Sequence, residues 1–261
     1  MPFFTISTFN ANSVRSRLQI LERWLIKNPV DVLCLQETKV SDDQFPASAF
    51  DSWGYHVFFR GRKAYAGVAI ACQGEPNEII YGFPDGKDGK DDDRLMMARF
   101  DDLWVINTYV PQGKSIDHPD YRYKKDFFRR FLDLLESEFK ADDKIIWVGD
   151  MNVAPEEKDV TKPETKRNHV CFHEEIRDIF DTVKSWGFVD VFRKHHPEEG
   201  QYTFWDYRVK NALERNIGWR VDHILATPSV ADRSVDCYID REPRSWEKPS
   251  DHTFLVGIFD L

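Results

Sequence analysis

Short apolar runs, bounded by polar turns, recur along the whole chain. Runs of about four to eight residues that are rich in β-branched and aromatic side chains are typical of strands. The runs that fit this pattern predict strands at Phe3–Phe9, Val30–Leu35, Tyr55–Phe59, Val68–Cys72, Leu95–Phe100, Leu103–Val110, Lys144–Val148, Val221–Ala226, Val235–Ile239 and Phe254–Phe259.

Three segments show the spacing of an amphipathic helix instead. The first of these places one apolar face at Val14, Leu18, Leu21 and Leu25. Ser13 is predicted to cap the start of this helix, and Asn28-Pro29 to end it. The other two helices are predicted at Tyr121–Phe139 and His173–Trp186.

The predicted strands outnumber the helices, and hairpin-like pairs of strands lie between the helical segments. This order predicts an α/β protein in which two mixed, mainly antiparallel sheets pack face to face with helices outside. Neither a repeat nor a long linker interrupts the pattern, so residues 1–261 are expected to form a single domain. The polar segment Asp85–Asp93 is predicted to be a solvated surface loop, because it lacks the ligand spacing of an EF-hand.

Composition adds constraints on location and partners. The formal net charge is −9 and the pI is near 5.4, whereas nucleic-acid-binding domains often exceed a pI of about 9. Binding depends on local patches, however, and carboxylates that hold a metal ion also lower the net charge. The sequence has no apolar stretch of about 18 residues, so a membrane span is not expected. The four widely spaced cysteines and the absence of a signal-peptide pattern predict a cytoplasmic protein.

Polar residues gather at the ends of the predicted strands, where binding sites commonly form. These residues are Asn10, Gln36, Glu37, Tyr109, Gln112, Asp150, Asn152, Asp222, Asp251 and His252. Each residue alone is more often a turn, cap or core residue than a functional one. Their joint occurrence at several strand ends of one sandwich predicts a common cleft.

The kinds of side chain in this set restrict the chemistry. Carboxylate and amide oxygens suit Mg²⁺ or Mn²⁺, and Asp222 with His252 can form an acid–imidazole pair. The sequence contains no cysteine–histidine cluster, so a structural zinc site is not expected. The chain also has no G-x-S-x-G and no Walker loop, which argues against a serine hydrolase and a P-loop enzyme.

Seven motifs, in this order and spacing, resemble exonuclease III and the related abasic-site endonucleases. They begin with Thr8-Phe9-Asn10-Ala11-Asn12, Leu35-Gln36-Glu37-Thr38-Lys39 and Asn107-Thr108-Tyr109-Val110-Pro111-Gln112-Gly113. They continue with Gly149-Asp150-Met151-Asn152-Val153-Ala154-Pro155, Tyr202-Thr203-Phe204-Trp205, Gly218-Trp219-Arg220-Val221-Asp222 and Pro249-Ser250-Asp251-His252. The resemblance spans nearly the whole chain and implies a four-layer α/β sandwich.

The resemblance also implies roles for the strand-end residues. The candidate metal ligands are Glu37 as the principal one, with Asn10, Asp150, Asn152, Asp251 and His252. The candidate catalytic residues are Tyr109, Asp150, Asn152, Asp222 and His252. Asp150 would orient or deprotonate a water, and His252, held by Asp222, would stabilise charge on the phosphate.

A pocket for a base-free sugar is implied by Phe204, Trp219 and Val221. Basic and aromatic side chains alternate between residues 205 and 220, as expected of a DNA-contacting loop. The candidate substrate-binding residues are therefore Gln112, Phe204, Trp205, Trp219, Val221, Arg208 and Lys210, with Tyr207, Arg215 and Arg220 in the same loop.

Two positions depart from the family pattern. Asn12-Ser13 replaces the usual Asn-Gly, and Ile116 stands where exonuclease III has an arginine, with Lys114 nearby. The second departure bears on how the loop after Gln112 holds the damaged strand, and so on the balance between endonuclease and exonuclease activity.

The resulting expectation is a Mg²⁺-dependent DNA phosphodiesterase of base excision repair, in which Mn²⁺ can replace Mg²⁺. It would incise 5′ to abasic sites and act as a 3′–5′ exonuclease and 3′-phosphatase. Its partner would be double-stranded DNA with abasic sites or blocked 3′ ends. The protein would act as a monomer and would not bind a membrane. In a prokaryote it would be associated with the nucleoid. The alternatives are a phospholipid or inositol phosphate phosphatase of the same superfamily, and an inactive DNA-binding relative. The aromatic pocket opposes the first, and the complete metal and catalytic set opposes the second.

Overall fold

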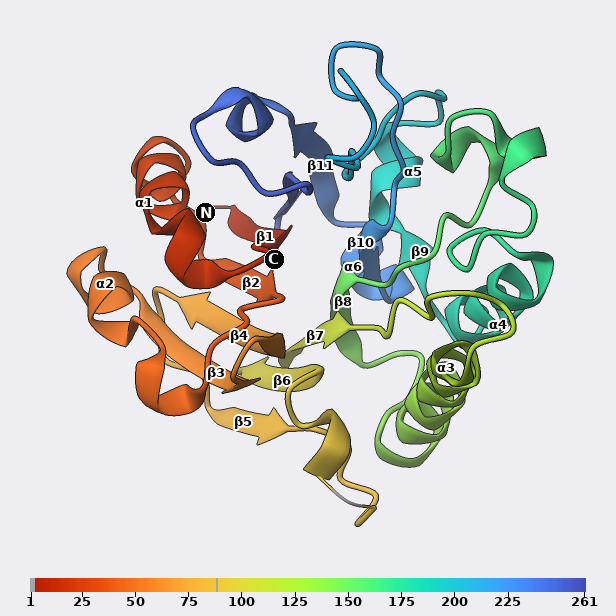
Figure 1. The fold of residues 1–261 in the computed structure, drawn as a ribbon. Coiled ribbons are helices and arrows are strands. Elements are labelled where there is room, and N and C mark those ends of the chain that lie inside the picture. Colours follow the sequence, from red (N-terminus) through yellow and green to blue (C-terminus); the bar gives the residue numbers. More distant parts are fainter. Residues whose placement is uncertain (1–2, 88) are drawn as a thin grey trace.

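A computed structural model describes residues 3–87 and 89–261, and it shows two sheets packed against each other (Figure 1). The first sheet contains, in spatial order, β11 (Ser234–Asp240), β12 (Phe254–Phe259), β1 (Phe4–Asn10), β2 (Val32–Gln36), β4 (Tyr65–Cys72) and β3 (His56–Arg62). The second contains β5 (Glu78–Tyr81), β6 (Leu95–Phe100), β7 (Leu103–Tyr109), β8 (Lys144–Asp150), β10 (Asp222–Ala226) and β9 (Val189–Asp190). Only the pairs β1–β2 and β7–β8 are parallel among the described strand pairs.

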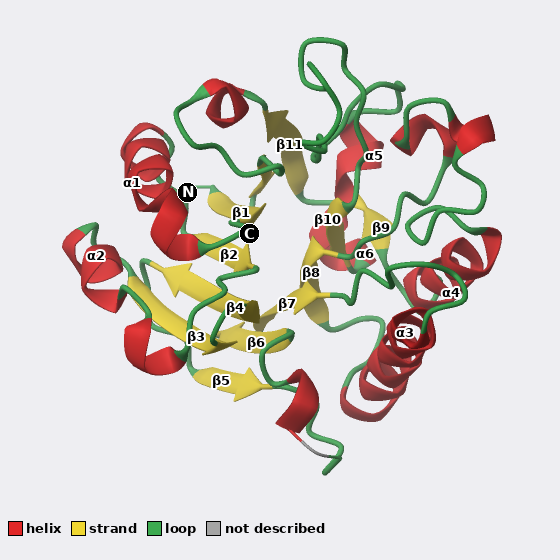
Figure 2. Cartoon of the chain, in the orientation of Figure 1, coloured by secondary structure: helices red, strands yellow, loops and turns green. Residues whose placement is uncertain are grey.

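Helices cover the outer faces of both sheets (Figure 2). They are α1 (Leu18–Lys27), α2 (Ala47–Ser52), α3 (Pro119–Glu138), α4 (Glu174–Lys184), α5 (Val191–His195) and α6 (Pro228–Ala231). Short 3-10 turns lie at Val14–Arg17, Asp42–Gln44, Gly89–Asp91, Glu157–Asp159, Pro163–Thr165 and Glu242–Ser245. None of the described helices is long and apolar enough to cross a bilayer.

Three apolar cores separate the layers. Trp24 of α1 and Phe50 of α2 pack on the first sheet. Residues such as Ile6 and Val148 fill the space between the sheets, and Phe127 of α3 packs on the second sheet. Each central strand is therefore buried on both faces, which is why its sequence is almost continuously apolar. This arrangement confirms the predicted four-layer α/β sandwich with mixed, mainly antiparallel sheets.

Strand pairing brings polar residues to one edge of the sandwich. Asn10 lies opposite Gln36 in the β1–β2 pair, and Asp150 lies opposite both Tyr109 and Asp222 in the second sheet. Gly149, at φ +138°, permits this close approach, because a Cβ there would lie 1.9 Å from the carbonyl oxygen of Thr108. The fold thus places the strand-end residues side by side.

The first predicted helix begins differently from the expectation. Ser13 has a φ of 89° and makes no side-chain capping bond, and a 3-10 turn at Val14–Arg17 precedes α1. Ser13 therefore holds the N-cap position of this 3-10 turn, but the predicted capping by its side chain was wrong. Its positive φ is the conformation that glycine favours. The predicted stop at Asn28 is confirmed.

The predicted solvated loop at Asp85–Asp93 is only partly exposed, and its Asp88 lies outside the described residues. Asp91 and Asp93 are buried. Asp91 accepts hydrogen bonds from Tyr123 and Arg130 of α3. The expectation was wrong for these two positions because segments distant in sequence supply their partners, α3 for Asp91 and Arg62 of β3 for Asp93.

Candidate active site

A cleft of about 280 Å³ opens at the strand ends described above. Residues from six of the seven motifs line it, together with the segments before α4 and after β9. The lining consists of Glu37, Gln112, Asp150, Asn152, Thr161, Lys166, His169, Cys171, Phe204, Asp206, Arg208, Val209, Ile217, Trp219, Val221, Asp251 and His252. Of the polar strand-end residues, Glu37, Gln112, Asp150, Asn152, Asp251 and His252 line this one cleft, whereas Asn10, Gln36, Tyr109 and Asp222 are not part of its lining.

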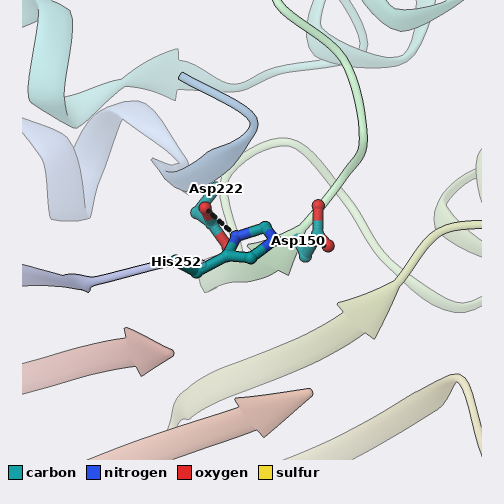
Figure 3. Close-up of side chains that lie close together, drawn as sticks. All are labelled: Asp150, Asp222 and His252. Carbon is teal, nitrogen blue, oxygen red and sulfur yellow. Dashed lines mark hydrogen bonds and ion pairs between the residues drawn. The ribbon is translucent and has the colours of Figure 1, made fainter. Parts of the chain in front are cut away.

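His252 lies between two carboxylates (Figure 3). Its Nδ1 is 2.8 Å from Oδ2 of Asp222, and its Nε2 is 3.8 Å from Oδ2 of Asp150. All three side chains are buried. Thr203 Oγ1 accepts a hydrogen bond from the backbone N–H of Asp222, which fixes the start of β10. The imidazole is thus held by Asp222 and presents its other nitrogen to Asp150.

A second group forms around Asn10 at the end of β1. Its Nδ2 donates to Oε1 of Glu37 at 2.9 Å and to Oδ2 of Asp150 at 2.8 Å. The Tyr109 hydroxyl also donates to Oε1 of Glu37, at 2.9 Å. One amide therefore holds a carboxylate from each sheet, and the two groups of polar residues meet at Asp150.

Charge in the cleft follows from burial and from these partners. Burial raises the pKa of Asp150 above its usual range, against the influence of His252. Burial acts to lower the pKa of His252, but Asp222 and Asp150 outweigh it and raise that pKa above its usual range. Burial also acts to raise the pKa of Glu37, yet Lys39 and Asn10 outweigh it and leave that pKa lowered. Glu37 is therefore ionised at neutral pH, while His252 favours the imidazolium form.

Two site residues adopt left-handed backbone conformations that non-glycine residues rarely use. Glu37 has a φ of 49° and Asn152 a φ of 52°. Conformations of this kind persist where the surroundings impose them, and they concentrate at functional sites. The backbone N–H of Asn152 donates to Oδ1 of Asp150 at 2.9 Å, so the turn after β8 also orients the Asp150 carboxylate.

Sequence comparison decides the family. A profile of the Endonuclease/Exonuclease/phosphatase family matches residues 7–252. The chain belongs to this family. Membership confirms the resemblance inferred from the seven motifs and the expectation of a hydrolase of the endonuclease/exonuclease/phosphatase type.

Relatives within this family match almost the full chain. Exodeoxyribonuclease III of Haemophilus influenzae is 37% identical over 265 residues, which cover 97% of this chain and 98% of the relative. The solved structure of an AP endonuclease from Archaeoglobus fulgidus has a TM-score of 0.96 at 51% identity, covering 99% of this chain and 100% of that one. The 3′ phosphatase NExo from Neisseria, bound to a product DNA hairpin, has a TM-score of 0.92 at 34% identity, with coverage of 99% and 100%.

The structure places the predicted pocket residues in the lining of the cleft. Phe204, Trp219 and Val221 line it, and so does Gln112. The ring of Phe204 packs on His252 at a centroid distance of 4.8 Å. The pocket wall is therefore in direct contact with the acid–imidazole pair.

Part of the predicted DNA-contacting loop has another role. Trp205 and Arg220 are completely buried, so neither side chain has surface for a substrate, which corrects both assignments. Arg220 pairs with Asp159 and Asp190 instead. Lys210 is exposed but lies outside the residues that line the cleft. Arg208 lines the cleft and pairs with the neighbouring Asp206 at 2.7 Å.

Three site residues lacked a role in the sequence-based prediction. Lys39 pairs with Oε2 of Glu37 at 2.6 Å, and Asn12 Nδ2 donates to Oδ1 of Asp251 at 3.0 Å. Both lie in recognised motifs, so their positions were a usable signal. His169 packs on Trp219 at a centroid distance of 4.5 Å. No motif contains His169, and only the fold shows that its segment reaches the pocket.

The donor set fits a hard cation. Asp150, Asp222 and His252 offer ligand atoms that all lie within 4.8 Å of one another. His252 Nδ1 is engaged by Asp222, so this trio is better described as an acid–imidazole pair beside a carboxylate. Glu37, which is ionised and lines the same cleft as Asp251, provides the oxygen ligands that Mg²⁺ or Mn²⁺ prefers. The cleft as a whole can therefore hold a metal ion.

Replacing Asp222 with Asn should lower the pKa of His252 toward the ordinary value of about 6.5, because it removes the strongest favourable influence on the imidazolium. The imidazole then loses its proton at lower pH than in the wild type. NMR titration of the ring in metal-free protein measures this shift. Asp206→Asn is the control, since Asp206 lines the cleft but pairs with Arg208. An unchanged pKa in Asp222→Asn would show that the pair does not set the charge of His252.

Proposed function

We propose that this chain is a Mg²⁺-dependent DNA phosphodiesterase of base excision repair, for which Mn²⁺ can substitute. It incises the backbone 5′ to abasic sites and has 3′–5′ exonuclease and 3′-phosphatase activity. The observation that carries this proposal is the cleft in which a buried Asp222–His252 pair faces Asp150 beside Glu37. The full-length relatives named as exodeoxyribonuclease III, AP endonuclease and 3′ phosphatase support it.

In the proposed reaction, Asp150 orients a water and accepts its proton. The raised pKa makes its carboxylate a stronger base than an ordinary aspartate. His252, favoured as an imidazolium by Asp222, places positive charge where negative charge accumulates on the phosphate. Burial raises the pKa of Tyr109 well above its usual range, so its hydroxyl stays protonated. Its single O–H, which donates to Glu37 in this structure, would turn to the same phosphate, to which Asn152 also donates.

Glu37 is the proposed principal metal ligand, supported by Asn10 and Asp251. When bound, Mg²⁺ would neutralise phosphate oxygens and act as a Lewis acid. Lys39 and Asn10 keep Glu37 ionised without it. Asn10 Oδ1 accepts a hydrogen bond from the backbone N–H of Asn12 at 3.0 Å, which fixes the amide between Glu37 and Asp150.

The proposed abasic subsite is the apolar wall of Phe204, Trp219 and Val221. A sugar without a base is small enough to enter, whereas an intact nucleotide must also give up stacking and pairing, at a cost of a few kcal/mol. His169, which lies in the loop before α4, packs against the ring of Trp219. These contacts hold the indole in place as one wall of the slot.

Three further expectations belong to this proposal. Residues 1–261 act as one domain and as a monomer on double-stranded DNA with abasic sites or blocked 3′ ends. The protein works in the cytoplasm, at the nucleoid if the cell is prokaryotic. The free, buried state of Cys34, Cys72, Cys171 and Cys237 supports a reducing compartment.

One labelled duplex set tests the function. It carries an abasic analogue, a uracil, a 3′-phosphate or no lesion, and products are resolved on denaturing gels with Mg²⁺ present. We expect rapid incision directly 5′ to the abasic analogue. An inert abasic duplex combined with hydrolysis of an inositol phosphate would instead favour the phosphatase alternative.

Removal of divalent cations should abolish the activity, because the proposed ligands are oxygen donors. Excess EDTA is expected to stop incision, and Glu37→Ala should need at least about tenfold more Mg²⁺ for the half-maximal rate. Glu75→Ala is the matched control, because Glu75 is an exposed glutamate outside the cleft. Full activity in EDTA, or an unchanged Mg²⁺ titration for Glu37→Ala, would contradict the metal assignment.

Trp219→Ala should weaken abasic-site incision more than 3′-phosphate removal, since an enlarged slot loses contacts with the bare sugar. We expect the ratio of kcat/KM for the abasic duplex to that for the 3′-phosphate end to fall roughly tenfold, the scale of one lost aromatic contact. Trp246→Ala serves as control, because Trp246 packs under Arg23 and does not line the cleft. Equal losses in both reactions would make Trp219 a general packing or DNA-binding residue.

A further inference from the structure

Lys124 is a completely buried lysine on α3, behind the cleft wall. Its three ammonium donors meet three backbone carbonyl oxygens: those of Asn152 at 2.6 Å, Val170 at 2.7 Å and Gln112 at 3.3 Å. A lysine has three N–H donors and no acceptor, so the hydrogen-bonding capacity of this ammonium is fully used. The cost of burying a charge is offset here by carbonyl dipoles.

The three carbonyls belong to three separate loops. Gln112 follows β7, Asn152 follows β8, and Val170 lies in the segment before α4. Gln112 and Asn152 line the cleft, as does Cys171, the neighbour of Val170. One side chain on a long helix therefore ties together three loops that form the wall on which the phosphate is proposed to bind.

Other contacts connect the same loops around Lys124. The backbone N–H of Ala154 donates to the carbonyl of Cys171 at 2.7 Å, and Cys171 Sγ lies 3.8 Å from Oδ1 of Asn152. A Cβ on Gly113, which has a φ of +101°, would lie 3.4 Å from both Lys124 Cδ and Val170 Cβ. The aliphatic stem of Lys124 thus fills the space between the loops that its ammonium joins.

No carboxylate forms a salt bridge with Lys124 within the described residues. The neighbouring Lys125, by contrast, pairs with Glu175 of α4 at 2.6 Å. A structural lysine could be paired in the same way, but Lys124 is paired with carbonyls only. Its positive charge therefore lies directly behind Asn152 and is not neutralised by a carboxylate of the described residues. From there it attracts a substrate phosphate in the cleft.

We propose that Lys124 is a positioning residue that holds the Gln112, Asn152 and Cys171 loops in the geometry needed to bind the scissile phosphate, without touching the DNA. The inference rests on the proposed phosphodiesterase function. Lys124 would keep three loops that follow different strands or precede a helix in fixed positions beside Asp150. Fixed positions matter because small displacements of positioning groups lower the reaction rate by large factors.

The test compares Lys124→Met, which keeps the stem and removes the ammonium, with Lys125→Met one position along the same helix. For Lys124→Met we expect kcat on the abasic duplex, per folded molecule, to fall at least about tenfold, while KM changes less than about twofold. Hydrogen exchange at residues 151–154 and 169–173 of the metal-free protein should accelerate about tenfold or more. Lys125→Met should match the wild type in kcat and in exchange at these residues.

Wild-type kcat in Lys124→Met would overturn the proposal, as would equal losses in both variants, which would indicate general packing of α3. If Lys124→Met does not fold, Lys124→Gln retains hydrogen-bond donors without the charge and is judged by the same two measurements. If the wild type does not incise DNA, the proposed function fails by itself. Hydrogen exchange then still decides the role of Lys124: faster exchange supports loop positioning and unchanged exchange overturns it.

Discussion

Five carboxylates lie around one cleft, and apart from Asp206, which pairs with Arg208, four of them meet at the strand ends. The rest of the site is arranged to make that concentration of charge tolerable. Asp150 and Asp222 are buried, while Glu37 and Asp251 are partly exposed. Lys39 and His252 are the cationic side chains that pair with these carboxylates in the described part of the chain. Isolated buried carboxylates are costly, so the excess negative charge favours both a raised pKa at Asp150 and a bound cation.

The architecture explains how the carboxylates come together. Glu37 follows β2 of one sheet, whereas Asp150 ends β8 of the other, and face-to-face packing of the sheets brings the two strand ends to the same edge. The Asn10 amide then bridges the two layers by donating to both carboxylates. The parallel pairs β1–β2 and β7–β8 matter here, because parallel strands end at the same edge of a sheet. A purely antiparallel meander would separate these ends.

Much of this could be predicted from the sequence, because its signals are local. β12 was predicted with the bounds Phe254–Phe259 that the structure shows, since its apolar run has clear polar borders. Short elements such as β5 and β9 were missed, because two to four residues carry too little periodicity. The polar residues at the strand ends were found because each lies within a motif, whereas lining residues outside the motifs, such as His169, were not.

The errors at the predicted DNA-contacting loop share a physical cause, which is the direction in which a side chain points. Trp205 and Arg220 have the composition of a DNA-contacting loop, yet both face inward. Arg220 does so because Asp159 and Asp190, distant in sequence, supply buried partners. Lys124 escaped notice for the same reason, because its partners are backbone carbonyls, which leave no trace in the sequence. Tertiary contacts, rather than residue type, decide these cases.

The most direct test of the account is Asp150→Asn, because Asp150 joins both polar groups of the cleft. Turnover on an abasic duplex and DNA affinity are measured on the same protein, the latter by equilibrium binding. We expect turnover to fall by a factor of at least about 10², with DNA bound as tightly as by the wild type or more tightly, since a negative charge beside the phosphate is removed. Loss of affinity in parallel with turnover would contradict the account and make Asp150 a structural support of the cleft.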